Sequence, residues 1–128
     1  MNQVVLITGG TSGIGWALAE AALARGDAVA VCGRSTPALE RFADRHPETV
    51  AVRCDVTIGA DRVALLKAVA DRFGRLDILI SNAGTFVERD FATDPAATQD
   101  LEAEVALNLT APIQLTHEAL SQFPALRA

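Results

Sequence analysis

Residues 8–15, with the sequence Thr-Gly-Gly-Thr-Ser-Gly-Ile-Gly, could bind a phosphate group. They follow the apolar run 4–7 and precede a helical pattern. Glycines lack a Cβ and let the backbone approach an anion, while the helix that follows offers free N–H groups and a positive dipole end. The pattern predicts a dinucleotide pyrophosphate site, with a purely structural turn as the alternative. The residues expected to contact the cofactor here are Gly9, Thr11, Ser12, Gly13, Ile14 and Gly15.

An arginine follows the second expected strand, in the sequence Cys32-Gly33-Arg34-Ser35. A protein that prefers NAD would carry an acidic side chain here to bind the adenosine ribose, and this chain has none. The planar guanidinium of Arg34 suits a 2′-phosphate, and Gly33 leaves room for it. The sequence therefore favours NADP(H) over NAD(H), with a solvated loop arginine as the alternative.

Polar and small residues also follow the third and fourth expected strands. Asp55 and Val56 come directly after the third, where Asp55 could bind a ligand or cap a turn. The sequence Asn82-Ala83-Gly84 follows the fourth. Its small residues would let the backbone lie against a cofactor ribose, and Asn82 could brace the neighbouring strand by hydrogen bonds.

Asn108 is the one catalytic candidate, and it lies within an expected helix. Pro112, four residues later, cannot donate the N–H that would normally bond the Asn108 carbonyl. That carbonyl is therefore expected to be free, in a kinked helix. A kink that serves packing alone is the alternative.

The elements that position these residues alternate between short β-rich runs and helical periodicity. Right-handed crossovers predict a Rossmann-type doubly wound parallel sheet with strand order 3-2-1-4 and flanking helices, an α/β fold with a crevice beside the first strand. The first helix carries Ile14, Leu18, Ala21 and Ala22 on one face. Strands are expected at 4–8, 28–32, 50–54 and 76–80, and helices at 13–25, 36–45, 60–73 and 97–123, after a loop at 81–95.

Composition restricts the function further. The 128 residues suit a single domain, and the net charge of −5 with scattered basic residues argues against nucleic-acid or membrane partners. A cytoplasmic protein is expected, because the sequence shows no signal peptide or membrane-spanning run.

His46 and His117 lack ligands at metal-binding spacing, so no metal is expected. Cys32 and Cys54 end neighbouring strands but are expected to stay reduced.

Together, the glycine turn, the Asp55-Val56 pair and the run 81–84 resemble the short-chain dehydrogenase/reductase family. The resemblance implies a hydride transfer between a nicotinamide cofactor and a small carbonyl or alcohol substrate. It also implies that Asp55 accepts a hydrogen bond from the adenine amino group, and that the Asn108 backbone carbonyl holds a water that connects to a catalytic lysine. One departure is Ser12, where many NADP-using members have a basic residue.

The resemblance runs over residues 4–123, which is about the first half of a typical member. Members use a tyrosine and a lysine for proton transfer, but this chain has no tyrosine, and its one lysine, Lys67, is expected away from the crevice. We therefore expect residues 1–128 to be the cofactor-binding half of a longer reductase domain, inactive alone and lacking the C-terminal strands. The alternatives are a non-catalytic NADP(H)-binding half-domain and a fragment that only associates. The exposed edge of the fourth strand, or the last helix, is expected to form a homo-oligomer.

Overall fold

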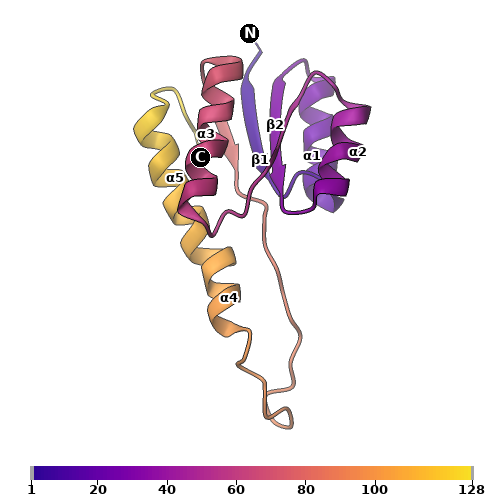
Figure 1. Cartoon of the computed structure of the whole chain (residues 1–128), viewed down its shortest axis with the longest axis vertical. Coiled ribbons are helices and arrows are strands. Elements are labelled where there is room, and N and C mark those ends of the chain that lie inside the picture. Colours follow the sequence, from indigo (N-terminus) through magenta and orange to yellow (C-terminus); the bar gives the residue numbers. More distant parts are fainter. Residues whose placement is uncertain (1, 128) are drawn as a thin grey trace.

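The computed structural model describes residues 2–127, which form a parallel sheet flanked by helices (Figure 1). The sheet order is β3-β2-β1-β4, which confirms the order predicted from the sequence. Val5 of β1 pairs with Val29 of β2 on one side and with Ile78 of β4 on the other. The strands are β1 (Val4–Thr8), β2 (Ala28–Gly33), β3 (Val50–Arg53) and β4 (Ile78–Ile80).

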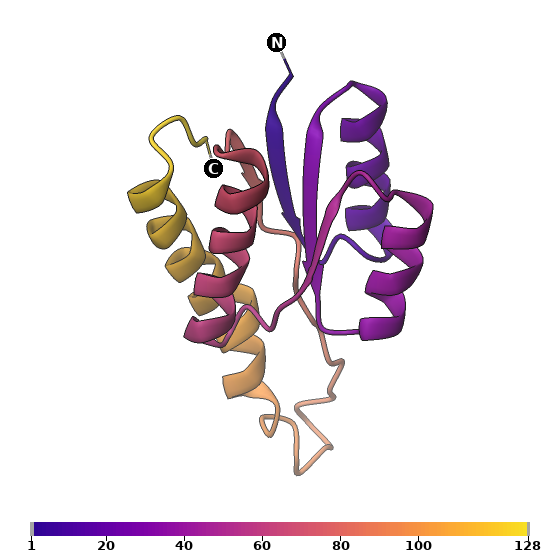
Figure 2. The same cartoon turned by 45° about the horizontal axis from the view of Figure 1, so that its top comes forward.

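Helices cover both faces of this sheet. Figures 1 and 2 show α1 and α2 on one face and α3 and α5 on the other. The short α4 and a π-helical turn, η1, lead into α5. The bounds are α1 (Gly13–Ala24), α2 (Thr36–Arg45), α3 (Gly59–Phe73), α4 (Leu101–Val105), η1 (Ala106–Thr110) and α5 (Ala111–Gln122).

Two hydrophobic cores lie on opposite sides of the sheet, because successive side chains of a strand point to opposite faces. Val5 and Ile7 of β1 pack with Phe42 of α2, whereas Leu6 packs with Leu65 of α3 and Leu115 of α5. The middle strands are therefore buried on both faces, as expected for a parallel sheet between helical layers.

The buried face of α1 differs from the one expected. Gly15, Ala19 and Ala22 are its buried residues, whereas Ile14 is 74% exposed and Leu18 is 37% exposed. Apolar residues occur all round this helix, so periodicity could not select the packed face. The smallest side chains face the sheet, which lets α1 approach it closely.

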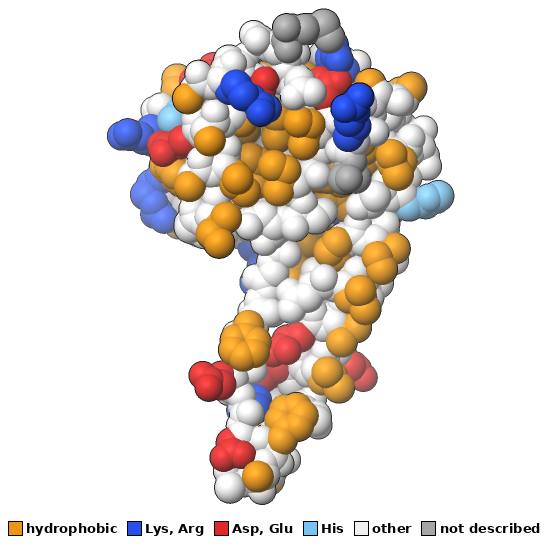
Figure 3. Space-filling model, turned by 180° about the vertical axis from the view of Figure 1, so that it is seen from behind, with side chains coloured by type: hydrophobic (Ala, Val, Ile, Leu, Met, Phe, Trp, Pro, Cys, Tyr) orange, Lys and Arg blue, Asp and Glu red, His pale blue; other side chains and the backbone are white. Residues whose placement is uncertain are grey.

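The helix expected over residues 97–123 begins later and is interrupted. It starts at Leu101, and in η1 the Ala111 N–H donates to the carbonyl of Ala106, five residues back. Pro112 explains the interruption, because it has no N–H for an α-helical bond to Asn108. Figures 1 and 3 show α4 and the preceding loop projecting beyond the sheet as an arm.

The free edge of β4 is less open than the sequence indicated. The Arg127 N–H donates to the Asp77 carbonyl at 2.7 Å, and the Leu79 N–H donates to the Arg127 carbonyl at 3.1 Å. These bonds form a parallel bridge between Ile78 and Arg127. Within residues 2–127, no helix has the length and apolar character needed to cross a membrane.

Candidate functional site

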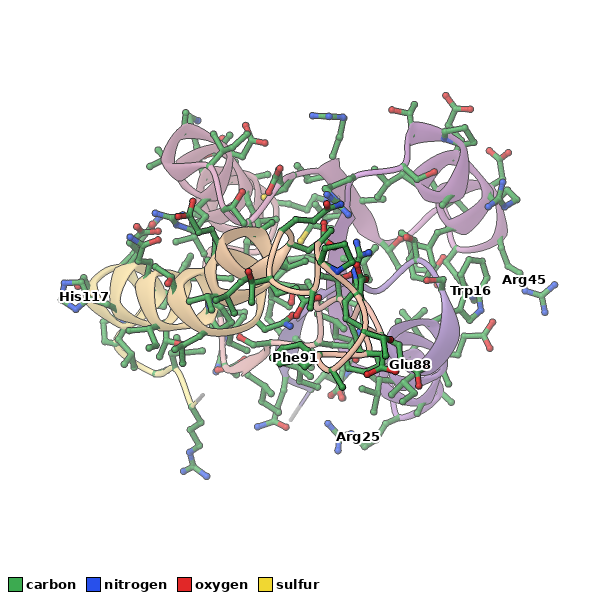
Figure 4. All side chains as sticks on the ribbon, turned by 90° about the horizontal axis from the view of Figure 1, so that it is seen from below. Trp16, Arg25, Arg45, Glu88, Phe91 and His117 are labelled. Atoms are coloured by element: carbon green, nitrogen blue, oxygen red, sulfur yellow. The ribbon has the colours of Figure 1, made fainter. Side chains whose placement is uncertain are left out.

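A cavity of about 490 Å³ opens at the carboxyl end of the sheet, beside β1. It lies where the projecting arm begins, and Figure 4 views the molecule from this end, with Phe91 and Glu88 of the loop in front. The structure brings together every predicted cofactor-binding residue except Gly15 on its wall. These wall residues are Gly9, Thr11, Ser12, Gly13, Ile14, Arg34, Asp55, Val56, Asn82, Ala83 and Gly84.

The glycine turn adopts backbone conformations that side chains disfavour. Gly9 has φ 65° and Gly13 has φ 54°, both in the left-handed region. The N–H groups of Gly9 and Gly10 donate to the Cys32 carbonyl at 2.9 and 3.3 Å, which fixes the turn to the end of β2. Ser12 directly precedes α1, and within the described chain its side chain caps no N–H group of the helix. The first-turn N–H groups of α1 therefore remain available to an anion.

Gly15 lies beneath the turn and not on the cavity wall. A Cβ at this position would overlap the Gly9 carbonyl and lie 2.6 Å from Asn82 Nδ2. Gly15 is therefore needed for close packing between α1 and the turn. Its contribution to the cavity is indirect.

Thr8, at the end of β1, connects the glycine turn to the segment after β4. Its buried hydroxyl oxygen accepts hydrogen bonds from the N–H of Asn82 at 3.0 Å and of Ala83 at 2.9 Å. Asn82 Nδ2 in turn donates to the Gly9 carbonyl at 3.1 Å, which confirms the predicted brace. Two walls of the cavity are thus held in fixed relation.

Asp55 caps the turn after β3. Its Oδ1 accepts a hydrogen bond from the Thr57 hydroxyl at 2.6 Å and from the Thr57 N–H at 3.0 Å. The Thr57 hydroxyl lowers the pKa of Asp55 most; burial opposes this effect, and the charges of Arg34 and Arg53 add to the lowering. Asp55 is therefore an ionised carboxylate on the cavity wall.

The wall beyond β2 carries a cation, Arg34, directly after a tightly packed glycine. Arg34 is exposed and follows Gly33, where an added Cβ would lie 3.0 Å from the Thr11 hydroxyl oxygen. A side chain at position 33 would therefore press on the glycine turn. The exposed guanidinium of Arg34 can therefore meet an anionic group in the cavity.

Asn108 lies off the cavity wall, and its neighbour Leu107 lies on it. The Asn108 side chain bonds the backbone of Thr85, at the start of the projecting loop. The sequence did not indicate six further wall residues, which lie within two positions of a predicted site residue or in the first turn of α2. These are Cys32, Gly33, Ser35, Ala38, Cys54 and Leu107.

The two cysteines and two histidines show no sign of a further reactive site among residues 2–127. Cys32 and Cys54 are free and buried, and a hydrogen bond with Cys54, together with burial, raises the pKa of Cys32. His46 directly follows α2, and its Nε2 lies 3.1 Å from Glu20 Oε1, whereas His117 points outward from α5 (Figure 4). Among residues 2–127, no cluster of three or more His, Cys, Asp or Glu side chains could hold a metal ion.

The sequence matches a known family of proteins. The sequence model of the family described as short chain dehydrogenase matches residues 3–127. The "uncharacterized oxidoreductase DltE" of Bacillus subtilis is 36% identical over 118 residues, which are 90% of this chain and 46% of that protein. The "11-beta-hydroxysteroid dehydrogenase-like 4A" of Arabidopsis thaliana is 36% identical over 124 residues, which are 93% of this chain and 41% of that protein.

Solved structures agree with this match. A short-chain dehydrogenase from Streptomyces avermitilis superposes with a TM-score of 0.84 at 35% identity, over 95% of this chain and 45% of that one. The chain therefore spans less than half the length of each of these three proteins.

Proposed function

The chain belongs to the short chain dehydrogenase family, and we propose that it is the NADP(H)-binding, N-terminal half of an oxidoreductase domain of that family. The intact protein would transfer hydride between nicotinamide and a small carbonyl or alcohol substrate. One observation carries the proposal: four chain segments with the chemistry to bind a dinucleotide line a single cavity.

The glycine turn fits a pyrophosphate. Gly9 and Gly13 hold left-handed backbone at the cavity wall, and the start of α1 presents N–H groups and the positive end of the helix dipole there. The Thr11 and Ser12 hydroxyl groups lie on the same wall as additional donors. A bound dinucleotide would supply or accept the hydride through its nicotinamide ring.

The neighbouring walls fit the adenosine half of NADP(H). Arg34 offers a planar cation for the 2′-phosphate, while Asp55 offers an ionised carboxylate to the adenine amino group. Because Thr57 occupies Oδ1 of Asp55, we assign adenine recognition to Oδ2. The short segment 82–84 would lie along a ribose of the cofactor.

Catalysis requires groups that these residues do not supply. The sequence contains no tyrosine, and its single lysine, Lys67, lies on α3 in an ion pair with Asp71. Asn108 is the one residue here for which the family implies a role near the reacting atoms, through its backbone carbonyl. We therefore propose that the 128 residues bind cofactor without turning over substrate.

A fluorescence titration of NADPH with the 128-residue chain tests this function. We expect saturable binding, and Arg34→Ala should weaken NADPH binding by about tenfold or more while changing NADH binding less than about twofold. Arg41→Ala is the matched control, because it removes the same charge from an exposed position of α2 and should leave the binding of both cofactors unchanged. Equal losses for both cofactors would remove Arg34 as the discriminator.

Two alternatives give different outcomes. A fragment that only associates would leave NADPH fluorescence unchanged at any protein concentration. A half-domain without a catalytic role would also bind NADPH. In that case, a longer chain that includes the downstream coding sequence would still show no carbonyl reduction. Steady-state turnover by the 128 residues alone would contradict the proposed inactivity.

A further inference from the structure

The turn formed by Asp55 and Val56 is held by two consecutive residues of the first turns of α3. The Asp61 carboxylate accepts a hydrogen bond from the Asp55 N–H at 2.9 Å. The Arg62 guanidinium donates from Nη1 to the Val56 carbonyl at 2.9 Å. Backbone groups on both sides of the turn are thus fixed by side chains of the same helix.

Arg62 also connects this turn to α5. Its Nε and Nη2 donate to the two carboxylate oxygens of Glu118 at 2.9 and 3.0 Å. Arg62 is only 6% exposed, whereas the Glu118 side chain is 33% exposed. The guanidinium therefore joins a cavity wall to a helix that is distant in sequence.

Only a guanidinium can make this set of contacts. Its donors lie in a rigid plane, so two of them can pair with a carboxylate while a third reaches a carbonyl in another direction. A lysine ammonium at the same position would lack that fork. Because a buried ion pair often adds little net stability, stability alone is a weak reason for this one.

We propose that Arg62 is a positioning residue for adenine recognition, an inference that rests on the proposed NADP(H) function. It sets the position of the Asp55-Val56 turn at the cavity edge. Through Glu118 it also fixes that turn relative to α5, which follows the π-helical turn that carries another lining residue of the cavity, Leu107. Loss of Arg62 would therefore leave Asp55 charged but misplaced.

A pair of cofactors that differ in one group tests this role. NADPH carries adenine, and its deaminated analogue carries hypoxanthine, which has a carbonyl in place of the amino group that Asp55 would bind. We expect the wild-type chain to prefer NADPH, and Arg62→Met to reduce that preference by about tenfold. Lys67→Met removes a positive charge from the exposed side of the same helix and should leave the preference unchanged.

A purely structural role gives a different result. If Arg62 only stabilised the fold, Arg62→Met would weaken both cofactors equally once each variant is measured below its unfolding temperature, and the preference would persist. That outcome would overturn the inference. If the wild-type chain binds neither cofactor, the proposed NADP(H) function itself fails. That result differs from a persisting preference in Arg62→Met, which overturns only the role of Arg62.

Glu118→Gln provides a second variant if Arg62→Met does not fold. It retains the Arg62 contact to Val56 but weakens the attachment to α5, so the preference should fall by about threefold. Glu118→Gln also retains one acceptor oxygen, now in an amide group, and a comparable volume at its partly exposed site. An unchanged preference in this variant would likewise overturn the inference.

Discussion

The side-chain amide of Asn108 bonds both backbone groups of Thr85. Asn108 Oδ1 accepts a hydrogen bond from the Thr85 N–H at 2.8 Å, and Nδ2 donates to the Thr85 carbonyl at 2.6 Å. This pair attaches the π-helical turn to the start of the projecting loop. It also explains Gly84, where a Cβ would lie 3.0 Å from Asn108 Oδ1.

Asn108→Ala should release the start of this loop. Both hydrogen bonds are lost, so exchange of the Thr85 amide hydrogen, followed by NMR, should accelerate by about tenfold, which corresponds to about 1.4 kcal/mol. Gln114→Ala, at an exposed position of α5, should leave this rate unchanged. Unaltered exchange in Asn108→Ala would show that other contacts hold the loop.

Gly15→Ala and Gly13→Ala should differ in their effects on stability. The added Cβ at position 15 overlaps the Gly9 carbonyl, so we expect a loss of about 3 kcal/mol in the free energy of unfolding and a loss of NADPH binding. At position 13 the Cβ meets open space and only the φ of 54° is strained, at a cost of about 1 kcal/mol. Urea unfolding followed by circular dichroism measures both values, and equal losses would refute the packing role of Gly15.

Asp77 should make the fold sensitive to acid. Burial raises its pKa, but hydrogen bonds from Arg75 and from the Val4 N–H outweigh burial and lower the pKa overall. A carboxyl group with a lowered pKa stabilises the fold above its unfolded pKa, and this contribution disappears as the pH falls through the folded value. The free energy of unfolding should therefore decrease below about pH 4.

Asp77→Asn separates this contribution from general acid denaturation. It should lower the free energy of unfolding at pH 7 by about 1–3 kcal/mol and flatten its dependence on pH below about pH 4. Asp71→Asn, which alters an exposed ion pair on α3, is the matched control and should have little effect. If the free energy of unfolding of Asp77→Asn depends on pH in the same way as that of the wild type, Asp77 does not cause the loss of stability in acid.

Exposed apolar side chains along the arm and α5 should mediate self-association. Figure 3 shows hydrophobic side chains gathered along the arm, and the exposed ones on its helical part continue onto α5. They are Leu101, Val105, Leu109, Ile113 and Leu120. A continuous apolar surface of this kind favours burial against a second copy.

Sedimentation velocity at micromolar concentration should therefore detect a dimer of the wild-type chain. Ile113→Glu should weaken it by about tenfold or more, because a charge would be buried in the contact. Gln114→Glu introduces the same charge at a neighbouring exposed position and should leave the dimer intact. A monomeric wild-type chain at this concentration would contradict the prediction.

The sequence predicted the sheet order because parallel strands and right-handed crossovers permit few arrangements. It did not predict the packed face of α1, since apolar residues occur on all sides of that helix and only contact with the sheet selects Gly15, Ala19 and Ala22. It also placed the start of the last helix too early. Pro112 predicted a kink within that helix, but not that the kink would take the form of a π-helical turn.

The sequence by itself determined the features that follow from local chain geometry. The glycine turn needs residues without Cβ atoms, and the alternation of strands and helices follows from apolar periodicity. Only the tertiary structure decided the contacts between Thr8 and Asn82, Thr85 and Asn108, and Arg62 and Glu118, which are 74, 23 and 56 residues apart. The physical reason is that a polar side chain bonds whichever group the folded backbone brings within about 3 Å, and no local pattern specifies that group.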